Sequence, residues 1–154
     1  MLELLKRIAN NAIHLDRNRI VRKALDNQTV QQAVIAMNQK QLYDEGVFAD
    51  GSPTGNYAKT TLDYKINEAG LLGRDTRTDH VTFKDKGDLY DTIRFENGEK
   101  GFALTGNTVK EGVDLEDTYR APIVGLTPDS IGKTIDLIKP DLIEITRNEL
   151  LKRD

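Results

Sequence analysis

The chain has 154 residues, of which 38% are hydrophobic, 31% charged and 6% aromatic, and its formal net charge is −3. This balance predicts one folded domain and argues against a disordered chain. The absence of cysteine excludes disulfides and thiolate metal sites. Neither a signal peptide nor a membrane span is expected, because no apolar run is long enough, so we expect synthesis in a cytoplasm. With no tryptophan, a thin core completed against neighbouring subunits is expected.

Charge is distributed unevenly along the chain. Residues 1–40 hold seven Lys or Arg against three Asp or Glu, whereas the remainder holds 15 basic and 22 acidic residues. Arg17, Arg19 and Arg22 form the centre of a basic cluster. The cluster fits a solvated helix face, or a head-to-tail contact between this region and the acidic region of another copy. Sequence-specific nucleic-acid binding is not expected, because no aromatic residue interleaves the cations.

The first third is predicted to be helical. Apolar residues recur at three- and four-residue steps over 2–25, which predicts one long helix. A second helix is predicted over 28–45, and Gly46 is placed to end it. The segment 46–60 is rich in Gly and Pro turn signals, and a short helix is expected from residue 60 or 61 to 69. We interpret 70–79 as a linker in which a protease would cut first, near Arg74 or Arg77.

The middle of the chain predicts β structure. His80–Phe83 is expected to be a short strand and Asp85–Tyr90 a turn or short helix. Asp91–Glu96 and Lys100–Thr105 are expected to pair around Asn97-Gly98, a dipeptide typical of hairpin turns. Val109–Leu115 is a candidate edge strand. Acidic residues there, Glu111, Asp114, Glu116 and Asp117, indicate an edge that resists aggregation.

The C-terminal region is predicted to be helical again. Thr127, Pro128 and Asp129 form a helix start, with a capping hydroxyl, proline at the first turn and an acid beside the helix dipole. This helix is expected to reach Lys139, and Pro140 then kinks it or opens a second helix ending near Arg153. The chain is therefore predicted to be a single α+β domain. Its expected parts are helical 1–45, loop and linker 46–79, β region 80–118 and helical 127–153.

Few residues indicate chemistry. His14 and His80 lack a neighbouring nucleophile and acid. Gly125–Thr134 departs from a phosphate-binding loop, because six residues rather than four separate Gly125 from the Gly-Lys-Thr and Pro128 removes a backbone N–H. We therefore predict no catalytic residue, no cofactor and no metal site. A nuclease using a divalent cation remains an alternative, and its candidate ligands are Asp50, Asp85 and Asp88.

One stretch, Lys86-Gly-Asp-Leu-Tyr-Asp-Thr-Ile93, precedes the predicted hairpin and is flanked by helices. It resembles the Thr-Gly-x-Leu-x-x-Ser-like turn of head-to-tail joining, or tail-completion, proteins in the necks of tailed bacteriophages. Lys86 stands where Thr is usual and Thr92 where Ser is usual. The pieces Gln41–Gly46, Tyr57–Thr61 and Tyr64-Lys65 also resemble small virion proteins of phages that infect Bacteroidetes, including the crAss-like group.

The resemblance implies a structural virion protein, made in the cytoplasm of a bacterial host. Its subunits would form a homo-oligomeric ring at the neck, in contact with portal, connector or tail proteins, and would act through interfaces rather than an active site. From the residues we expect Leu89, Tyr90 and Ile93 to be packing anchors, and Gly87 and Gly98 to be required by backbone geometry. The main alternative is a small adaptor or binding module of a mobile element.

Overall fold

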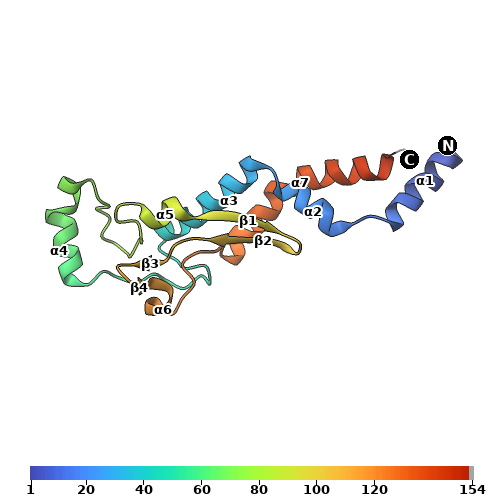
Figure 1. Cartoon of the computed structure of the whole chain (residues 1–154). Coiled ribbons are helices and arrows are strands. Elements are labelled where there is room, and N and C mark those ends of the chain that lie inside the picture. Colours follow the sequence, from blue (N-terminus) through green and yellow to red (C-terminus); the bar gives the residue numbers. More distant parts are fainter. Residues whose placement is uncertain (153–154) are drawn as a thin grey trace.

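The computed structural model describes residues 1–152 and has an α+β fold with an elongated outline (Figure 1). The helices are α1 (Leu2–Ile13), α2 (Arg17–Leu25), α3 (Gln28–Lys40), the π-helix η1 (Gln41–Glu45), α4 (Lys59–Asn67), the 3₁₀ helix η2 (Ala69–Leu72), α5 (Asp88–Thr92), α6 (Leu115–Tyr119) and α7 (Pro128–Leu151). The strands are β1 (Arg94–Gly98), β2 (Gly101–Thr105), β3 (Val109–Lys110) and β4 (Val113–Asp114). Helices α1 and α4 lie at opposite ends of the long axis, and the β1–β2 hairpin lies between them.

The predicted single helix over 2–25 is wrong, because the chain breaks between Ile13 and Arg17. The Asp16 side chain accepts a hydrogen bond from the Arg19 N–H at 3.0 Å, which is the contact of a helix N-cap. A residue that caps a new helix competes with continuation of the preceding one. As a result, α1 extends beyond α2 instead of continuing its axis (Figure 1).

The second predicted helix is confirmed, with its last turn wound as the π-helix η1. Gly46 ends it in the left-handed region, at φ 63°. His80 packs at this end: its Nε2 lies 3.2 Å from the Leu42 carbonyl and 2.9 Å from that of Tyr43. Because both partners are acceptors, Nε2 carries the proton and satisfies carbonyls at the helix terminus.

Two buried clusters form the core. The first joins α2, α3 and α7 through Ala24, Leu25, Val30, Val34 and Ile138, and the stacked rings of the β1–β2 hairpin, Phe95 and Phe102, cover it. The second joins η1 to α5 through Leu42, Phe48, Leu89, Tyr90 and Ile123. Helix α3 contributes to the first cluster and η1 to the second, and the two clusters are connected because η1 follows α3 directly.

A buried polar contact lies where the two clusters meet. The Asn38 amide donates to the carbonyls of Ile123 and Gly125, at 3.1 and 2.8 Å. Gln41 donates to the Gly125 carbonyl and accepts from the Thr127 N–H, both at 3.1 Å. Together these bonds fix the start of α7 against the end of α3.

The predicted hairpin is confirmed, but its turn is shifted. Gly98 pairs with Gly101, so Glu99-Lys100 makes the turn and Asn97 pairs with Phe102 within the ladder. The Asn97 amide instead donates to the Arg22 carbonyl and to Asp26, which ties the hairpin to α2. Tertiary contact of Asn97 thus overrides its local turn preference.

Two other β predictions are wrong. His80–Phe83 is not a strand, because Phe83 adopts φ 58° and turns the chain. The candidate edge strand over Val109–Leu115 is instead the small β3–β4 hairpin, with Glu111 and Gly112 both at positive φ. That backbone is typical of a two-residue hairpin turn. The acidic residues after it also have local roles, since Asp114 caps α6 and Glu116 accepts the Ile123 and Val124 N–H groups.

The C-terminal helix starts as predicted, with Thr127 accepting the Ser130 N–H. It does not end at Pro140, which lies inside the single helix Pro128–Leu151. Pro140 is on the exposed side, where water can satisfy the Asp136 carbonyl that loses its intrahelical donor. The predicted end near Arg153 lies outside the described residues.

The close approach of His80 makes Gly46 a test of this fold. A Cβ on Gly46 would lie 2.7 Å from the His80 ring, whereas a Cβ on Gly51, also at positive φ, would meet nothing within 4 Å. We expect Gly51→Ala to cost about 1 kcal/mol through backbone strain alone. Gly46→Ala should cost about 1–2 kcal/mol more, because His80 must move from its two carbonyls. Urea denaturation measures both, and equal losses would contradict this role of His80.

Candidate functional site: an apolar arm and an opposite tip

One end of the molecule is an arm formed by α1 and the C-terminal half of α7, residues 139–151. All of α1 is described, and none of its residues is buried. Leu2 is 64% exposed, Leu5 55% and Ile143 61%. Helix α1 packs on α7 without reaching either core cluster. The arm therefore presents apolar side chains that the chain itself leaves in water.

These side chains border a shallow apolar groove between the two helices. Its volume is about 750 Å³. Its lining residues are Ile8, Lys139, Leu142, Ile143, Thr146, Arg147, Leu150 and Leu151. The two charged members, Lys139 and Arg147, are both cations. An apolar floor with a cationic rim is typical of a protein-binding surface rather than of a solvated helix face.

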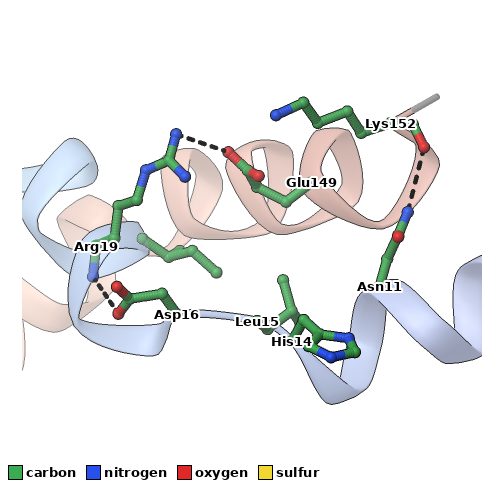
Figure 2. Close-up of a pocket in the computed structure, with 8 residues that line it drawn as sticks. Asn11, His14, Leu15, Asp16, Arg19, Glu149 and Lys152 are labelled. Atoms are coloured by element: carbon green, nitrogen blue, oxygen red, sulfur yellow. Dashed lines mark hydrogen bonds and ion pairs between the residues drawn. The ribbon is translucent and has the colours of Figure 1, made fainter. Parts of the chain in front are cut away.

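The base of the arm is held by polar contacts, and Figure 2 shows those of Asn11 with Lys152 and of Arg19 with Glu149. The Asn11 amide donates to the Leu150 and Lys152 carbonyls at 3.0 and 3.2 Å, so α1 caps the end of α7. Arg19 and Lys23 approach Glu149 at 3.8 and 3.0 Å. A cavity of about 150 Å³ lies between these contacts. The hydrogen bond from Lys23 holds the pKa of the Glu149 carboxyl below its usual value.

The other end of the molecule is a tip formed by α4 and η2. Ile66, Leu71 and Leu72 are exposed there, and Leu71 reaches 87%. Leu71 and Leu72 are carried by a single 3₁₀ turn that ends at Gly73 in the left-handed conformation. Asp63 and Glu68 are also exposed on this segment. The tip is thus apolar with acidic flanks.

A buried ion pair anchors the tip to the body. The Lys65 ammonium on α4 donates to an Asp75 carboxylate oxygen at 2.8 Å and to the Asp75 carbonyl at 2.9 Å. Thr82 donates to the same carboxylate oxygen at 2.6 Å, and Tyr90 donates to the Thr82 carbonyl at 2.6 Å. The network therefore joins the tip to the second core cluster.

The same network sets the ionisation of its members. Burial raises the pKa of the Asp75 carboxyl, but the hydrogen bonds from Lys65 and Thr82 outweigh it, so that pKa lies below its usual value. Burial lowers the pKa of Lys65, but the interactions with Asp75 and Tyr57 together outweigh that effect, so the pKa lies above its usual value. Both groups stay charged near neutral pH, as a buried pair requires.

The residues predicted as packing anchors lie in or beside the core, away from the arm and the tip. Leu89, Tyr90 and Ile93 are 7%, 8% and 1% exposed. Gly87 precedes α5 at φ 99°, a conformation that favours glycine. The expectation that Gly98 occupies the hairpin turn is wrong; it ends β1, where a Cβ would approach the Gly101 carbonyl to 3.3 Å.

The basic cluster lies on α2, beside the base of the arm. Arg17, Arg19 and Arg22 are all exposed. Arg19 shares Glu149 with Lys23, and the backbone carbonyl of Arg22 receives the Asn97 amide. The charge of Arg19 is therefore partly used within the chain to hold α7, whereas Arg22 binds the β1–β2 hairpin through its uncharged backbone carbonyl.

The residues considered for chemistry have structural partners, except Asp88, which is exposed at the start of α5. His14 hydrogen-bonds to the Asn10 carbonyl, and Asp50 accepts two hydrogen bonds from Ser52. Asp85 is paired with Lys110 at 2.7 Å and with Arg74 at 3.4 Å. Over residues 1–152, no three His, Asp or Glu side chains are grouped to hold a metal ion.

Sequence reasoning missed the tip and part of the groove. The turn-rich composition of 70–79 favours a linker. The signal for the tip within it is Leu71-Leu72, an apolar pair between two glycines, which is typical of a small surface patch. Ile143 was also missed, because α7 carries apolar residues on several faces and periodicity alone does not choose between them.

Comparison with known proteins finds no family model, no curated protein and no solved structure that matches this chain. Within the described part of the chain, the helices fall short of the length and apolar character that crossing a membrane requires.

Removal of the Asn11 amide tests the base of the arm. We expect Asn11→Ala to increase amide hydrogen exchange in α1, because about 1 kcal/mol of capping interaction is lost. Exchange in α3 should stay unchanged, since that helix belongs to the core. Asn10→Ala is a matched control, because the structure gives the Asn10 side chain no such contact to α7 among residues 1–152. Unaltered exchange in α1 would contradict the capping role.

The buried pair is tested by removing one charge. Asp75→Asn should lower the free energy of unfolding at neutral pH by about 3–5 kcal/mol, because Lys65 is left buried and unpaired. Since the Asp75 pKa is depressed on folding, its contribution is present above about pH 4 and is lost as pH falls through the folded-state value. Asp75→Asn should therefore lose less stability on acidification than the wild type. Urea denaturation at several pH values measures this, and an equal loss of stability on acidification in the two proteins would contradict the prediction.

Proposed function

We propose that this protein is a structural subunit that functions by assembling with copies of itself. The observation that carries the proposal is the arm, in which a whole helix and half of another leave apolar side chains in water. Exposed apolar side chains gathered on one part of a surface mark an interaction site, and their burial against a neighbour stabilises an assembly. Function then resides in the contact itself and needs no reacting group.

The more specific proposal is a homo-oligomeric ring at the neck of a tailed-phage particle, in contact with portal, connector or tail proteins. Its support is the resemblance of Lys86–Ile93 and the flanking helices to head-to-tail joining and tail-completion proteins. The α+β fold, with helices on either side of a hairpin, is compatible with such a subunit. A virion location would follow from that role.

A monomeric adaptor is the competing function, and mass in solution separates the two. We expect the wild-type chain to form a defined oligomer in native mass spectrometry and in light scattering, with closed rings visible by negative-stain electron microscopy. A chain that stays monomeric at its highest attainable concentration would contradict the assembly proposal and favour the adaptor.

A single charge in the groove supplies the mutational test. Ile143→Asp should raise the subunit dissociation constant by at least about tenfold, because one hydrophobic anchor contributes roughly 1–3 kcal/mol. Val109→Asp is the matched control: Val109 is also about half exposed but lies on β3, away from the arm. Sedimentation equilibrium measures both variants. Equal behaviour of the two would show that the groove is not the contact.

A further inference from the structure

The arm and the tip lie at opposite ends of the molecule (Figure 1), and both expose apolar side chains. Resting on the proposed assembly function, we infer that the groove of one copy binds the α4–η2 tip of the next. The occupant of the groove is therefore Ile66, Leu71 and Leu72 of a second copy. The contact is head-to-tail, so each subunit uses two different surfaces.

Charge favours this occupant. The groove carries Lys139 and Arg147 as its charged lining residues. On the tip, Asp63 lies one helical turn before Ile66, and Glu68 lies between Ile66 and Leu71. The nearest exposed cation on α4, Lys59, lies two turns before Ile66 at the start of the helix. An acidic apolar tip therefore meets a cationic apolar groove, which is the complementarity that selects partners and fixes register.

The same charges disfavour pairing of two grooves. In a two-fold symmetric contact each surface meets itself, so the Lys139 and Arg147 side chains of both copies would gather at one apolar contact. Like charges placed together at an interface oppose binding. Pairing of two tips would likewise bring the acidic residues Asp63 and Glu68 of both copies together. Groove-to-tip pairing brings opposite charges together in each contact, and self-pairing of either surface does not.

The length of helix α4 in the tip also fits the length of the groove. Helix α4 has nine residues, which at 1.5 Å per residue is about 14 Å. The part of α7 that lines the groove runs from Lys139 to Leu151, 13 residues and a length of about 20 Å. A short helix can thus lie in the groove along its length, a recognition mode in which apolar side chains insert while charges stay at the rim.

The tip is held rigidly enough to act as an insert. The buried Lys65–Asp75 pair ties α4 to the chain that follows η2, and Thr82 and Tyr90 extend that attachment to the core. A pre-organised insert loses less conformational freedom on binding than a flexible loop would. The ion pair therefore acts as a positioning element for the contact, in addition to its effect on stability.

Two complementary variants test the inference. Ile143→Asp blocks the groove and Leu71→Asp blocks the tip, and both positions are exposed, so neither change disturbs a core. We expect each variant alone to be monomeric. An equimolar mixture should give a one-to-one heterodimer and nothing larger, because it contains one intact groove and one intact tip that can pair. Native mass spectrometry distinguishes these species directly, and circular dichroism checks that both variants are folded.

The outcomes separate this inference from the assembly proposal. If Leu71→Asp assembles like the wild type while Ile143→Asp does not, the groove pairs with something other than the tip, and the inference fails while assembly stands. If the mixture stays monomeric although the wild type assembles, the two surfaces do not meet. If the wild type is itself monomeric, both the inference and the proposed function fail.

Charge reversal provides an independent check of the register. Arg147→Glu should weaken assembly at least about fivefold, and combination with Glu68→Lys in the same chain should restore most of the loss. Raising the salt concentration should weaken the wild-type contact and affect the Arg147→Glu variant less, because fewer attractive pairs remain to be screened. A double variant as weak as Arg147→Glu alone would place Glu68 away from the groove.

Discussion

The rest of the structure depends on the buried hydrogen bonds of Asn38 and Gln41. These two amides are almost fully buried, and they form hydrogen bonds with the backbone carbonyl and N–H groups where the chain enters α7. Burial of an amide without partners costs a few kcal/mol, so the partners must stay in register. Because α3 contributes to the first core cluster and η1, which continues it, contributes to the second, this one contact sets the position of α7 relative to both. The direction of α7 then determines where the arm projects.

This arrangement separates stability from the proposed interface. The apolar residues that hold the fold, such as Val34 and Leu42, are buried around the centre of the molecule. Those available for assembly, such as Ile143 and Leu71, lie at the two ends and leave the core intact when changed. A subunit of this kind can fold before it assembles. Substitutions at its two ends can change which partner it binds without changing its fold. The chain has few aromatic residues, and three of them, Phe48, Phe83 and Tyr119, contact one another in the centre of the molecule.

Local signals in the sequence predicted much of the fold. Thr127 with Pro128 starts α7, and Gly46 ends η1, because capping is decided by a few neighbouring residues. The errors arose where distant contacts override local preference: Asn97 leaves the turn to bind α2, and Phe83 leaves the extended region at the junction with α5. The candidate surfaces were harder to predict. An exposed leucine such as Leu71 looks the same in sequence as a buried one, and only the packing of the whole chain shows which apolar residues remain uncovered.

The proline inside α7 has a consequence for the geometry of any assembly. Pro140 removes one hydrogen bond from the helix between the part fixed in the core and the part that lines the groove. In a head-to-tail assembly the angle between successive subunits decides whether the series closes and at how many copies. The direction that α7 takes after Pro140 sets where the groove lies relative to the core, and it therefore contributes to that angle. The curvature of the assembly therefore depends on the helix around Pro140, whereas the apolar part of its contact depends on groove residues further along α7, such as Ile143 and Leu150.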